Sequence, residues 1–319
     1  MVAILGAALT NFNRRKDGSS FRDWAADAFL RALAMSGLEC SDIDALFLAS
    51  ESDFFTLQLN PASVLADDLG LAGAASARIE GGGASGQLAV HAAVNAILAG
   101  SATRAAVIGV DPSASQLPAD TVRTLYSYSF DAWHDGMTGV TPTALYALSV
   151  QGFLHRTGLG TDSLATVTIQ NRANACSNAT AHLPRQHTPD EIDASPMIAS
   201  PYRRLHCSPL SDGAAALILA KPETAPSERS KAPRIAGIGA ASDRAQLGAR
   251  AEPDRFLAKT KAMQRACAMA GVTPMDIGLA EVYDSYAGAQ LQAIEALGLS
   301  DEVSTDLRSG SFAPDGRCP

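Results

Sequence analysis

The chain has 319 residues, of which 47% are hydrophobic and 18% are charged. This composition is typical of a folded soluble protein, and the length favours two domains or one large duplicated domain. The formal net charge of −8 argues against a general nucleic-acid partner, because phosphate binding requires clustered Lys and Arg residues, which no segment provides.

The first apolar stretch, residues 1–9, has no basic flank before it and is interrupted by Gly6. It is therefore predicted to be a strand rather than a signal peptide or a membrane span. The cysteines are odd in number and widely scattered, which suits a reducing compartment better than a disulfide scaffold. We therefore expect a cytoplasmic protein. The five cysteines are Cys40, Cys176, Cys207, Cys267 and Cys318.

Strands and helices alternate in the first part of the chain. After the strand over residues 1–9, the pattern predicts a helix that ends at Gly37, a strand over 45–50, a helix over 61–69, a helix over 87–98 and a buried strand over 104–110. Such a succession implies a sheet with parallel strands and with helices on its faces. The predicted fold class is therefore α/β.

Residues 111–200 form a long insertion that is rich in Tyr, Ser, Thr and His, and they contain one strong helical pattern over 143–157. Connections of this length usually cover a site. Residues 208–221 are predicted to form a turn and then a buried apolar strand, which closes the first half of the chain.

The chain contains an internal repeat. Residues 31–43 (RALAMSGLECSDI) align without a gap with residues 265–277 (RACAMAGVTPMDI), and seven of the thirteen positions are identical. In both copies a helix ends at a glycine cap, Gly37 or Gly271, and an Asp-Ile pair leads to a predicted strand, the second of which covers 279–284. Chance similarity between two Ala-rich helices is the alternative. Duplication of an α/β unit is favoured because the Asp-Ile match lies outside the helix.

The two copies also begin alike. Residues 3–7 and 234–238 are short apolar runs with an internal glycine, and both are predicted to be first strands. Only 43 residues (319 − 276 = 43) follow Asp276, too few for a second glycine-rich turn with its helix and strand, so we expect an incomplete C-terminal half. The predicted division is an N-terminal half over 1–225, which includes the insertion, and a C-terminal half over 232–319.

A glycine-rich turn precedes the helix predicted over 87–98. Backbone N–H groups at a helix start, together with the helix dipole, favour a phosphate, a carboxylate or a developing oxyanion. The turn is therefore a candidate oxyanion site, although a turn that serves only close helix packing is the simpler alternative. Its candidate residues are Gly81, Gly82, Gly83, Ser85 and Gly86.

Three glycines of this turn also fit the spacing of a dinucleotide-binding fingerprint, and Asp111 ends the next strand 25 residues after Gly86 (111 − 86 = 25). The strand before such a turn should be a buried apolar run, however, whereas residues 75–80 offer little beyond Ile79. Ser85 does not fit a nucleophile elbow, because glycine follows it at once. The dinucleotide interpretation is therefore disfavoured.

Six segments, taken in order, carry a family resemblance. They are AILGAALTNF, SDIDALFLAS, GGGASG, SPYRRLHCSPLSDGAAALIL, AEVYDSYAGAQLQAIEALGL and GRCP. Together they resemble a thiolase of the sterol-carrier or lipid-transfer type, over essentially the whole chain. The resemblance implies a duplicated βαβ fold with a layered α-β-α-β-α architecture, and an active site that handles acyl-coenzyme A thioesters.

The family's nucleophilic cysteine would stand two residues before the Ser-Gly of the glycine-rich loop. Gly83 occupies that position, and all five cysteines lie outside the loop. A thiolase needs a thiolate to form an acyl-enzyme, so we expect this chain to lack that step. The family's Gly-His-Pro histidine and second cysteine belong to loops that would follow Pro319.

Some lipid-transfer-type relatives are aldolases of steroid side-chain degradation, which pair with a small zinc-ribbon and oligonucleotide-fold protein and use tyrosines as acid and base. The resemblance therefore implies retro-aldol cleavage of a β-hydroxyacyl-CoA. This reaction needs a base at the hydroxyl and an oxyanion hole at the carbonyl, but no covalent intermediate.

Tyr283 stands where classical thiolases place an Asn or a His, and it is the first catalytic candidate. Since a free tyrosine with a pKa near ~10 is a weak base at neutral pH, it would need a neighbouring charge or donor. Asp284 is the candidate for organising its loop, and an aromatic that only packs is the alternative for Tyr283. Tyr286 is expected to pack, and contact with the acyl chain is considered for Tyr126, Tyr128 and Trp133.

Two other functions stay open: an acyltransferase whose nucleophile lies beyond this chain, and a non-catalytic subunit that binds acyl-CoA or lipid. The six histidines show no ligand spacing, so no metal site is predicted. Coenzyme A is expected only as part of the substrate, with no permanently bound cofactor. The expected partners are the acyl-CoA substrate, a second copy in a homodimer formed through the sheet edge near the glycine-rich loop, and a small zinc-ribbon protein.

Overall fold

The computed structural model describes residues 1–14 and 17–319, and the chain divides into two compact units. Most of the insertion predicted over 111–200 belongs to the same unit as most of the second repeat copy. Unit 1 comprises Met1–Val122 and Leu210–Ala236, and unit 2 comprises Arg123–Pro209 and Gly237–Pro319.

Unit 1 is built on a six-stranded sheet. Its strands are β1 (Val2–Leu9), β2 (Ala45–Ala49), β3 (Ala75–Ile79), β4 (Arg104–Val110), β7 (Ala214–Ala220) and β8 (Arg234–Ile235). They lie in the order β3-β2-β4-β7-β1-β8. β2 runs parallel to β3 and to β4, whereas β7 is antiparallel to β4 and to β1, and β8 is antiparallel to β1. The predicted parallel arrangement is therefore confirmed for β2, β3 and β4, whereas the sheet as a whole is mixed.

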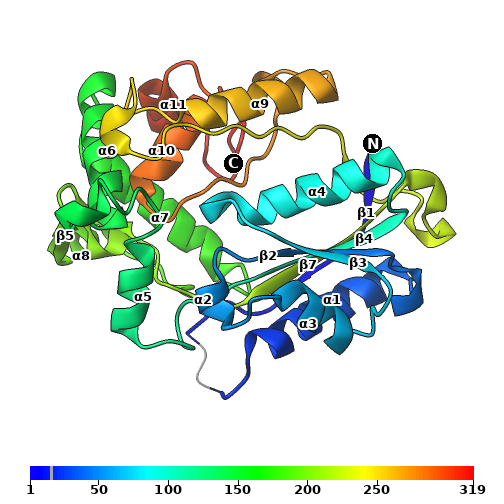
Figure 1. Ribbon diagram of the computed structural model, residues 1–319. Helices are drawn as coiled ribbons and strands as arrows, with labels where there is room; N and C mark the ends of the chain where they lie inside the picture. Colours follow the sequence, from blue (N-terminus) through cyan, green and yellow to red (C-terminus); the bar gives the residue numbers. More distant parts are fainter. Residues whose placement is uncertain (15–16) are drawn as a thin grey trace. The chain divides into compact units, whose positions relative to one another are not determined.

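Helices cover both faces of this sheet (Figure 1). α1 (Phe21–Ser36) and α3 (Pro61–Asp68) pack on one face, and α4 (Ser85–Ala99) packs on the other. The short helix α2 (Asp53–Thr56) follows β2. The α/β class and the helices predicted over 61–69 and 87–98 are confirmed.

The main core of unit 1 lies between α1, α3 and the sheet. Trp24 and Phe29 of α1 are 2% and 0% exposed, and they form one apolar cluster with Leu46, Ile108 and Ile218 of the sheet. Burial of each large apolar side chain contributes about 1.5–3 kcal/mol. β2 belongs to this core and pairs in parallel with β3, from whose carboxyl end the glycine-rich turn begins.

The two repeat copies share the same local packing. A Cβ built at Gly6 would lie 2.0 Å from the backbone oxygen of Ala32, and a Cβ built at Gly237 would lie 2.1 Å from that of Ala266. Ala32 and Ala266 are equivalent in the repeat, so in each copy a glycine lets the helix backbone approach directly. Gly37 and Gly271 both adopt left-handed backbone with φ of 73°, which supports the duplication.

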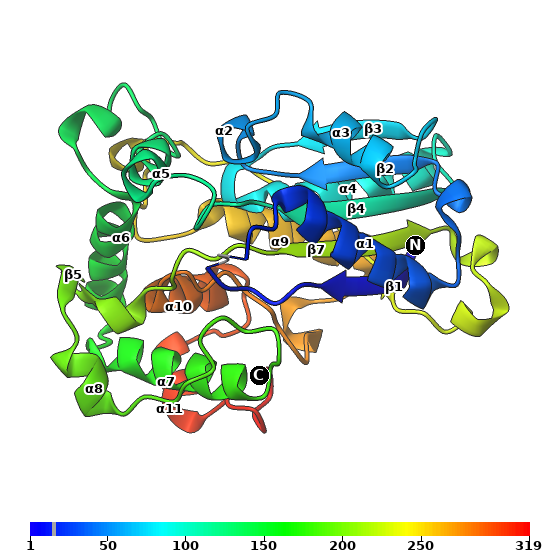
Figure 2. The same ribbon diagram turned by 90° about the horizontal axis from the view of Figure 1, so that it is seen from below.

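Unit 2 is mainly helical, and Figure 2 shows α10 beside α6 and α7. Its elements are α6 (Pro142–Thr157), α7 (Asp162–Cys176), α8 (Pro189–Ala194), β5 (Met197–Ala199), β6 (Tyr202–Arg203), α9 (Leu257–Ala270), α10 (Ala287–Ala296) and α11 (Val303–Ser309). Phe153, Leu164 and Leu291 are fully buried in one cluster with Tyr202. α5 (Ala119–Tyr126) crosses the boundary between the units along the chain.

Three expectations need correction. The helix predicted over 143–157 is confirmed as α6, but the insertion also contains α7 and α8, whose polar residues obscure the helical period. The strand predicted over 279–284 is wrong, and only the first two residues of 234–238 form a strand. A strand needs a continuous hydrogen-bonded neighbour, whereas the Ala280 amide donates to the Pro319 carbonyl at 3.2 Å in an isolated contact.

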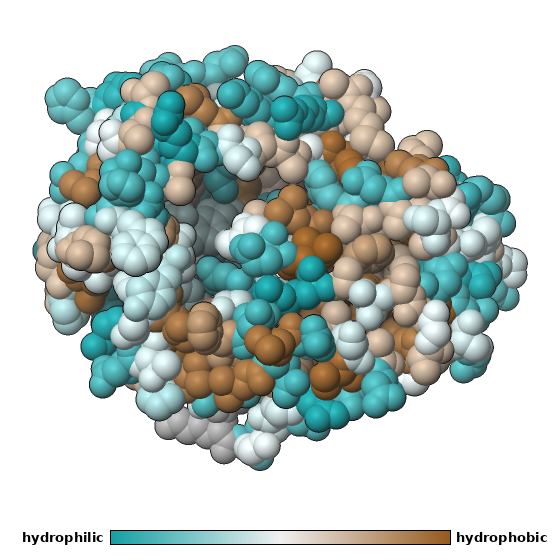
Figure 3. Space-filling view, in the orientation of Figure 1, coloured by the Kyte–Doolittle hydropathy of each residue, from teal (hydrophilic) through white to brown (hydrophobic). Residues whose placement is uncertain are grey.

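On the face shown in Figure 3, hydrophobic patches are separated by hydrophilic side chains. α1 and α6 each contain 16 residues. Across residues 1–14 and 17–319, no helix combines the length and the apolar character needed to cross a membrane.

Candidate functional site

The glycine-rich loop connects β3 to α4 through a short 3₁₀ turn, Gly82–Ala84, in unit 1. Several of its polar groups are bound within the loop. The Gly81 amide donates to Ser85 Oγ at 3.0 Å, and the Gly82 amide donates to Glu80 Oε1 at 2.7 Å. Ser85 is 6% exposed, and its hydroxyl donates to the Gly82 carbonyl at 2.7 Å. Ser85 therefore holds the shape of the loop.

The exposed side of the loop has room for a larger residue. A Cβ built at Gly83 or at Gly86 meets no heavy atom within 4 Å, whereas one built at Gly81 would lie 2.2 Å from Leu88 Cδ1. Gly82 has a φ of 57°, which favours glycine. The position at which thiolases carry their cysteine is therefore open to a side chain, although glycine stands there.

Asp111 would contact the ribose in the dinucleotide interpretation. In the structure, its carboxylate is instead hydrogen-bonded to groups of the protein. Its two carboxylate oxygens accept hydrogen bonds from the Ser50 hydroxyl at 3.0 Å and from the Glu51 amide at 2.9 Å. Burial raises the pKa of Asp111 to about 6, while these hydrogen bonds oppose the rise. The arrangement favours a structural role over contact with a nucleotide.

Four aromatic rings of unit 2 form a tyrosine cluster, which consists of Tyr146 from α6, Tyr202 from β6, and Tyr283 and Tyr286 from the segment before α10. The ring centroid of Tyr146 lies 6.0 Å from that of Tyr283 and 4.6 Å from that of Tyr286. Tyr202 and Tyr286 are stacked at 5.3 Å. The Tyr286 hydroxyl lies 3.0 Å from Thr143 Oγ1.

The members of the tyrosine cluster differ in exposure. Burial, and then proximity to Tyr283, raise the pKa of Tyr146. Burial also raises the pKa of Tyr202 and of Tyr286, although the hydrogen bond with Thr143 lowers that of Tyr286. Tyr283 is 39% exposed. The cluster thus consists of the buried Tyr202, two partly buried phenols that also stay protonated at neutral pH, and one phenol that solvent or a ligand can reach.

A cation lies against the exposed tyrosine. Lys259 Nζ, from α9, is 5.4 Å from the ring centroid of Tyr283 and 5.3 Å from that of Phe256. Such contacts contribute about 0.5–2 kcal/mol. Burial lowers the pKa of Lys259 from its usual value. Lys259 is therefore a charged neighbour of Tyr283 that no pattern in the sequence indicates.

Asp284 is tied to α7. Its Oδ2 accepts a hydrogen bond from Asn171 Nδ2 at 2.9 Å, and the same Nδ2 donates to Gln290 Oε1 at 2.7 Å. Burial raises the pKa of Asp284, and the Asn171 hydrogen bond opposes this. The Asn171 amide therefore links the segment that carries Tyr283 to the start of α10.

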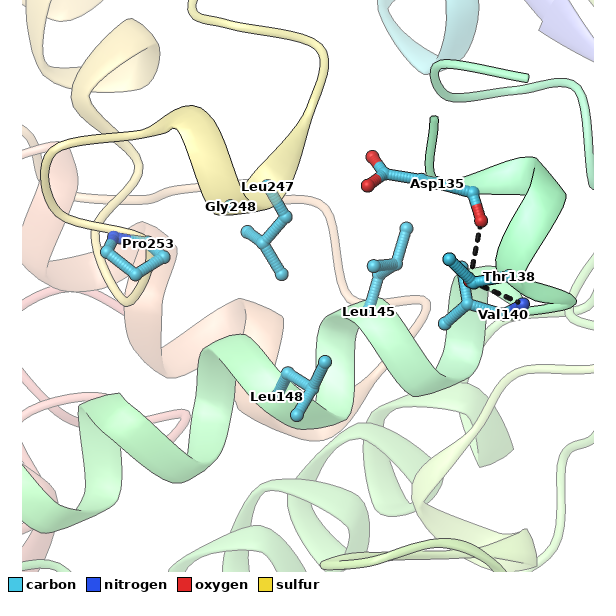
Figure 4. A pocket seen from close by; sticks show the side chains of 8 residues that line it. All are labelled: Asp135, Thr138, Val140, Leu145, Leu148, Leu247, Gly248 and Pro253. Carbon is cyan, nitrogen blue, oxygen red and sulfur yellow. Dashed lines mark hydrogen bonds between the residues drawn. The ribbon is translucent and has the colours of Figure 1, made fainter. Parts of the chain in front are cut away.

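Unit 2 also contains a cavity of about 360 Å³ that shares α6 with the tyrosine cluster (Figure 4). Leu145 and Leu148 point into it from α6, and Leu247 and Pro253 lie opposite. Asp135, Thr138, Val140 and Gly248 complete the lining.

Tyr283 and Asp284 were candidates from the sequence, whereas Tyr146 and Lys259 come to notice only through their contacts with Tyr283 in the structure. Tyr146 carried a signal, because it is an aromatic residue within the helix predicted over 143–157, whereas Lys259 carried none. Of the aromatic residues considered for acyl-chain contact, Tyr128 and Trp133 are 60% and 85% exposed. Neither residue lines the cavity.

Comparison with known proteins identifies the family. Residues 239–319 match the family model described as thiolase C-terminal domain-like. The acetyl-CoA acetyltransferase of Methanothermobacter thermautotrophicus is 32% identical over 321 residues, which cover 100% of this chain and 83% of that protein. The steroid side-chain-cleaving aldolase of Thermomonospora curvata is 26% identical over 336 residues, which cover 99% and 83% of the two chains.

Among solved structures, the Ltp2-ChsH2(DUF35) aldolase superposes with a TM-score of 0.82 at 26% identity, over 100% of this chain and 82% of that chain. These relatives and this structure match the chain over nearly its whole length, which includes the six motifs between residues 3 and 319. The chain therefore belongs to the thiolase superfamily, to its sterol-carrier or lipid-transfer type, and is a thiolase-like acyl-CoA enzyme.

Proposed function

We propose that this enzyme cleaves a carbon–carbon bond of a β-hydroxyacyl-CoA by a retro-aldol reaction, without a cysteine nucleophile. The tyrosine cluster carries the proposal, because it surrounds the accessible phenol of Tyr283 in a chain whose glycine-rich loop has no thiol. Similarity to the steroid side-chain-cleaving aldolase and to the Ltp2-ChsH2(DUF35) aldolase supports the same reaction class.

The reaction needs a base and a stabilised enolate. The base takes the proton of the β-hydroxyl, the bond between Cα and Cβ breaks, and its electron pair moves into the thioester as an enolate. Cβ becomes the carbonyl carbon of a released ketone or aldehyde. The enolate then takes a proton at Cα and leaves as a shortened acyl-CoA. No oxidant and no covalent intermediate are required.

We assign the proton transfers to Tyr283. It is the most accessible phenol of the tyrosine cluster, and the Lys259 ammonium lies 5.4 Å from its ring centroid. Tyr146 and Tyr286 are partly buried phenols whose pKa values are raised, so they serve as hydrogen-bond donors rather than bases. Asp284 holds the segment in place through Asn171.

We assign enolate stabilisation to the glycine-rich loop over 81–86. The Gly81 and Gly82 amides and the Ser85 hydroxyl donate hydrogen bonds within residues 80–85, which fixes the backbone before any substrate arrives. Preorganised amide donors at the start of a helix stabilise a developing oxyanion in many acyl-transfer enzymes. Gly83 leaves space above the loop, which suits a thioester better than a covalent acyl group.

Acyl transfer is the second candidate function, because the acetyl-CoA acetyltransferase relative is 32% identical. Product analysis separates the two. With a β-hydroxyacyl-CoA and no free coenzyme A, the retro-aldol reaction releases a carbonyl compound and a shortened acyl-CoA. Products that form only when free coenzyme A is added would overturn the proposal in favour of acyl transfer.

We further propose a homodimer and a small partner protein. β3 is an edge strand of the sheet, and residues 75–77 are exposed, which supports pairing with a second copy. The Ltp2-ChsH2(DUF35) aldolase supports the partner, because it contains a DUF35 component. Light scattering of the chain alone and with a DUF35 protein tests both proposals.

A further inference from the structure

Gln292 carries a polar side chain that is buried in the middle of α10, where it is 1% exposed. Its Nε2 donates two hydrogen bonds, one to Ser149 Oγ of α6 at 2.8 Å and one to the Asp254 carbonyl at 2.8 Å. Its Oε1 is buried and has no hydrogen-bond partner within residues 1–14 and 17–319. An unpaired buried acceptor costs about 1–3 kcal/mol, so stability alone does not account for this amide.

The two bonds of Gln292 converge on the backbone just before α9. Ser149 is 4% exposed, and its hydroxyl donates in turn to the Pro253 carbonyl at 2.7 Å. Gln292 thus fixes two successive carbonyl groups, one directly and one through the Ser149 hydroxyl. α6 also approaches this backbone closely, because a Cβ built at Gly152 would lie 2.9 Å from Asp254 Cβ. The backbone before α9 is therefore held against α6 and α10.

The side chain of Asp254 is held by a separate set of contacts. Arg156 Nε donates to Asp254 Oδ2 at 2.6 Å, and the two other nitrogens of Arg156 donate to the Glu295 carboxylate at 2.8 Å each. These side chains are 30%, 19% and 22% exposed, in the order Arg156, Asp254 and Glu295. Solvent weakens ion pairs at such exposure, so the buried amide of Gln292 fixes the backbone more firmly.

The fixed backbone leads directly to the residues that contact Tyr283. Phe256 is the N-cap residue of α9, and its ring lies 6.4 Å from that of Tyr146. Lys259 lies in the first turn of α9, with Nζ 5.3 Å from the ring centroid of Phe256 and 5.4 Å from that of Tyr283. A displacement at Asp254 would therefore move Lys259 relative to the tyrosine.

We infer that Gln292 is a positioning residue, whose amide fixes the start of α9 so that the Lys259 ammonium stays against the Tyr283 ring. α10 begins directly after Tyr286, so the same helix fixes both sides of this contact. The inference rests on the proposed function for the reaction at Tyr283. It extends that function with a residue that acts only through the backbone of another segment.

The position of Lys259 can be measured without any turnover. The chain has five lysines, so a sample labelled with ¹³C-lysine gives few side-chain NMR signals, and Lys259→Arg assigns the signal that disappears. Ring currents of Phe256 and Tyr283 should place the Cε protons of Lys259 upfield of those of the other lysines. Gln292→Met keeps much of the side-chain volume but removes both donors, and it should abolish most of this upfield displacement.

Kinetics test whether Gln292 acts through Lys259. Gln292→Met should lower kcat for β-hydroxyacyl-CoA cleavage about tenfold and leave KM unchanged. In a Lys259→Met background the same substitution should cause no further loss, because the contact that it positions is already absent. Losses that add in the double variant would overturn the inference.

A control on the same helix separates positioning from stability. Ile294 is 4% exposed and packs in the apolar cluster of unit 2. Ile294→Val should lower the melting temperature by about 2–4 °C without moving the Lys259 signal. Ser149→Ala removes the link to the Pro253 carbonyl and should move the signal in the same direction as Gln292→Met. It carries the test if Gln292→Met does not fold.

An unmoved Lys259 signal in the folded Gln292 and Ser149 variants would overturn the inference, and so would an equal movement in Ile294→Val. If the signal moves only in the two polar variants but the unaltered chain cleaves no β-hydroxyacyl-CoA, the proposed reaction fails while the positioning role of Gln292 stands.

Discussion

The ammonium nitrogen of Lys259 lies 5.4 Å from the ring centroid of Tyr283. The two residues come from α9 and from the segment before α10, and Phe256 packs against the same ammonium at 5.3 Å. The contact of an ammonium group with the face of an aromatic ring is an attractive cation–π interaction. In the proposed reaction, this cation stabilises the negative charge that develops during proton transfer at Tyr283.

Replacing Lys259 should therefore slow the chemical step. Lys259→Met removes the charge while keeping most of the side-chain volume, and we expect kcat for β-hydroxyacyl-CoA cleavage to fall about tenfold, which corresponds to about 1.4 kcal/mol. Lys259→Arg should retain most of the rate because it keeps the charge. Steady-state kinetics over a range of pH checks this, and an unchanged kcat in Lys259→Met would show that the cation plays no part.

The open space at Gly83 predicts that a thiol can be introduced there. Gly83→Cys should fold with a melting temperature close to that of the unaltered chain, since a Cβ there meets no atom within 4 Å. Gly82→Cys is the matched control, because its left-handed φ of 57° is strained for a residue with a side chain and should lower the melting temperature.

The same pair of variants tests the absence of a nucleophile. After incubation with bromoacetyl-CoA, peptide mass spectrometry should find an adduct at position 83 only in Gly83→Cys. An adduct within residues 81–86 of the unaltered chain would contradict non-covalent chemistry.

The raised pKa of Asp111 predicts that the stability of the fold depends on pH. Its pKa is about 6 in the folded protein and 3.8 in a model peptide, so folding favours the protonated carboxyl. Its stabilising contribution is fully present below about pH 4 and is lost as the pH rises through about 6. The ionised form then costs about 3 kcal/mol.

Asp111→Asn should remove this dependence. The free energy of unfolding of Asp111→Asn, relative to the unaltered chain, should rise by up to about 3 kcal/mol from about pH 4 to about pH 8. Urea unfolding at several pH values measures it. A difference between the two proteins that does not change with pH would refute the assignment of the titrating group.

Asn171 is predicted to position the segment that carries Tyr283. Asn171→Leu leaves Asp284 and Gln290 without their donor, and we expect unfolding to become about 1–3 kcal/mol easier and kcat/KM to fall. Asn174→Leu is the control on the same helix, because Asn174 is exposed. Equal effects of the two substitutions would mean that the Asn171 hydrogen bonds have no special role.

Local patterns in the sequence predicted much of unit 1. The strand over 104–110 and the helix over 61–69 follow from apolar periodicity and capping, and the structure places β4 and α3 there. The repeat predicted matching glycines, and Gly37 and Gly271 have the same φ. Such features are determined by residues that are close in the sequence, so they can be predicted without a structure.

Unit 2 was harder to predict because its site depends on contacts between distant segments. The tyrosine cluster joins α6, β6 and the segment before α10, and no spacing in the sequence shows that these rings meet. The strand predicted over 279–284 failed for a similar reason, since strand formation depends on a partner elsewhere in the chain. Lys259 sits in an ordinary polar stretch of α9, so only tertiary packing reveals its proximity to Tyr283.

The central claim is that Tyr283 transfers the proton in a cleavage that needs no thiol. Tyr283→Phe keeps the ring but removes the hydroxyl, and Tyr128→Phe makes the same change at a tyrosine that is 60% exposed and lies outside the tyrosine cluster. The direct measurement is the rate at which a β-hydroxyacyl-CoA yields a carbonyl compound and a shortened acyl-CoA. We predict a loss of at least about a hundredfold in Tyr283→Phe and no loss in Tyr128→Phe, and an unchanged rate in Tyr283→Phe would contradict the mechanism.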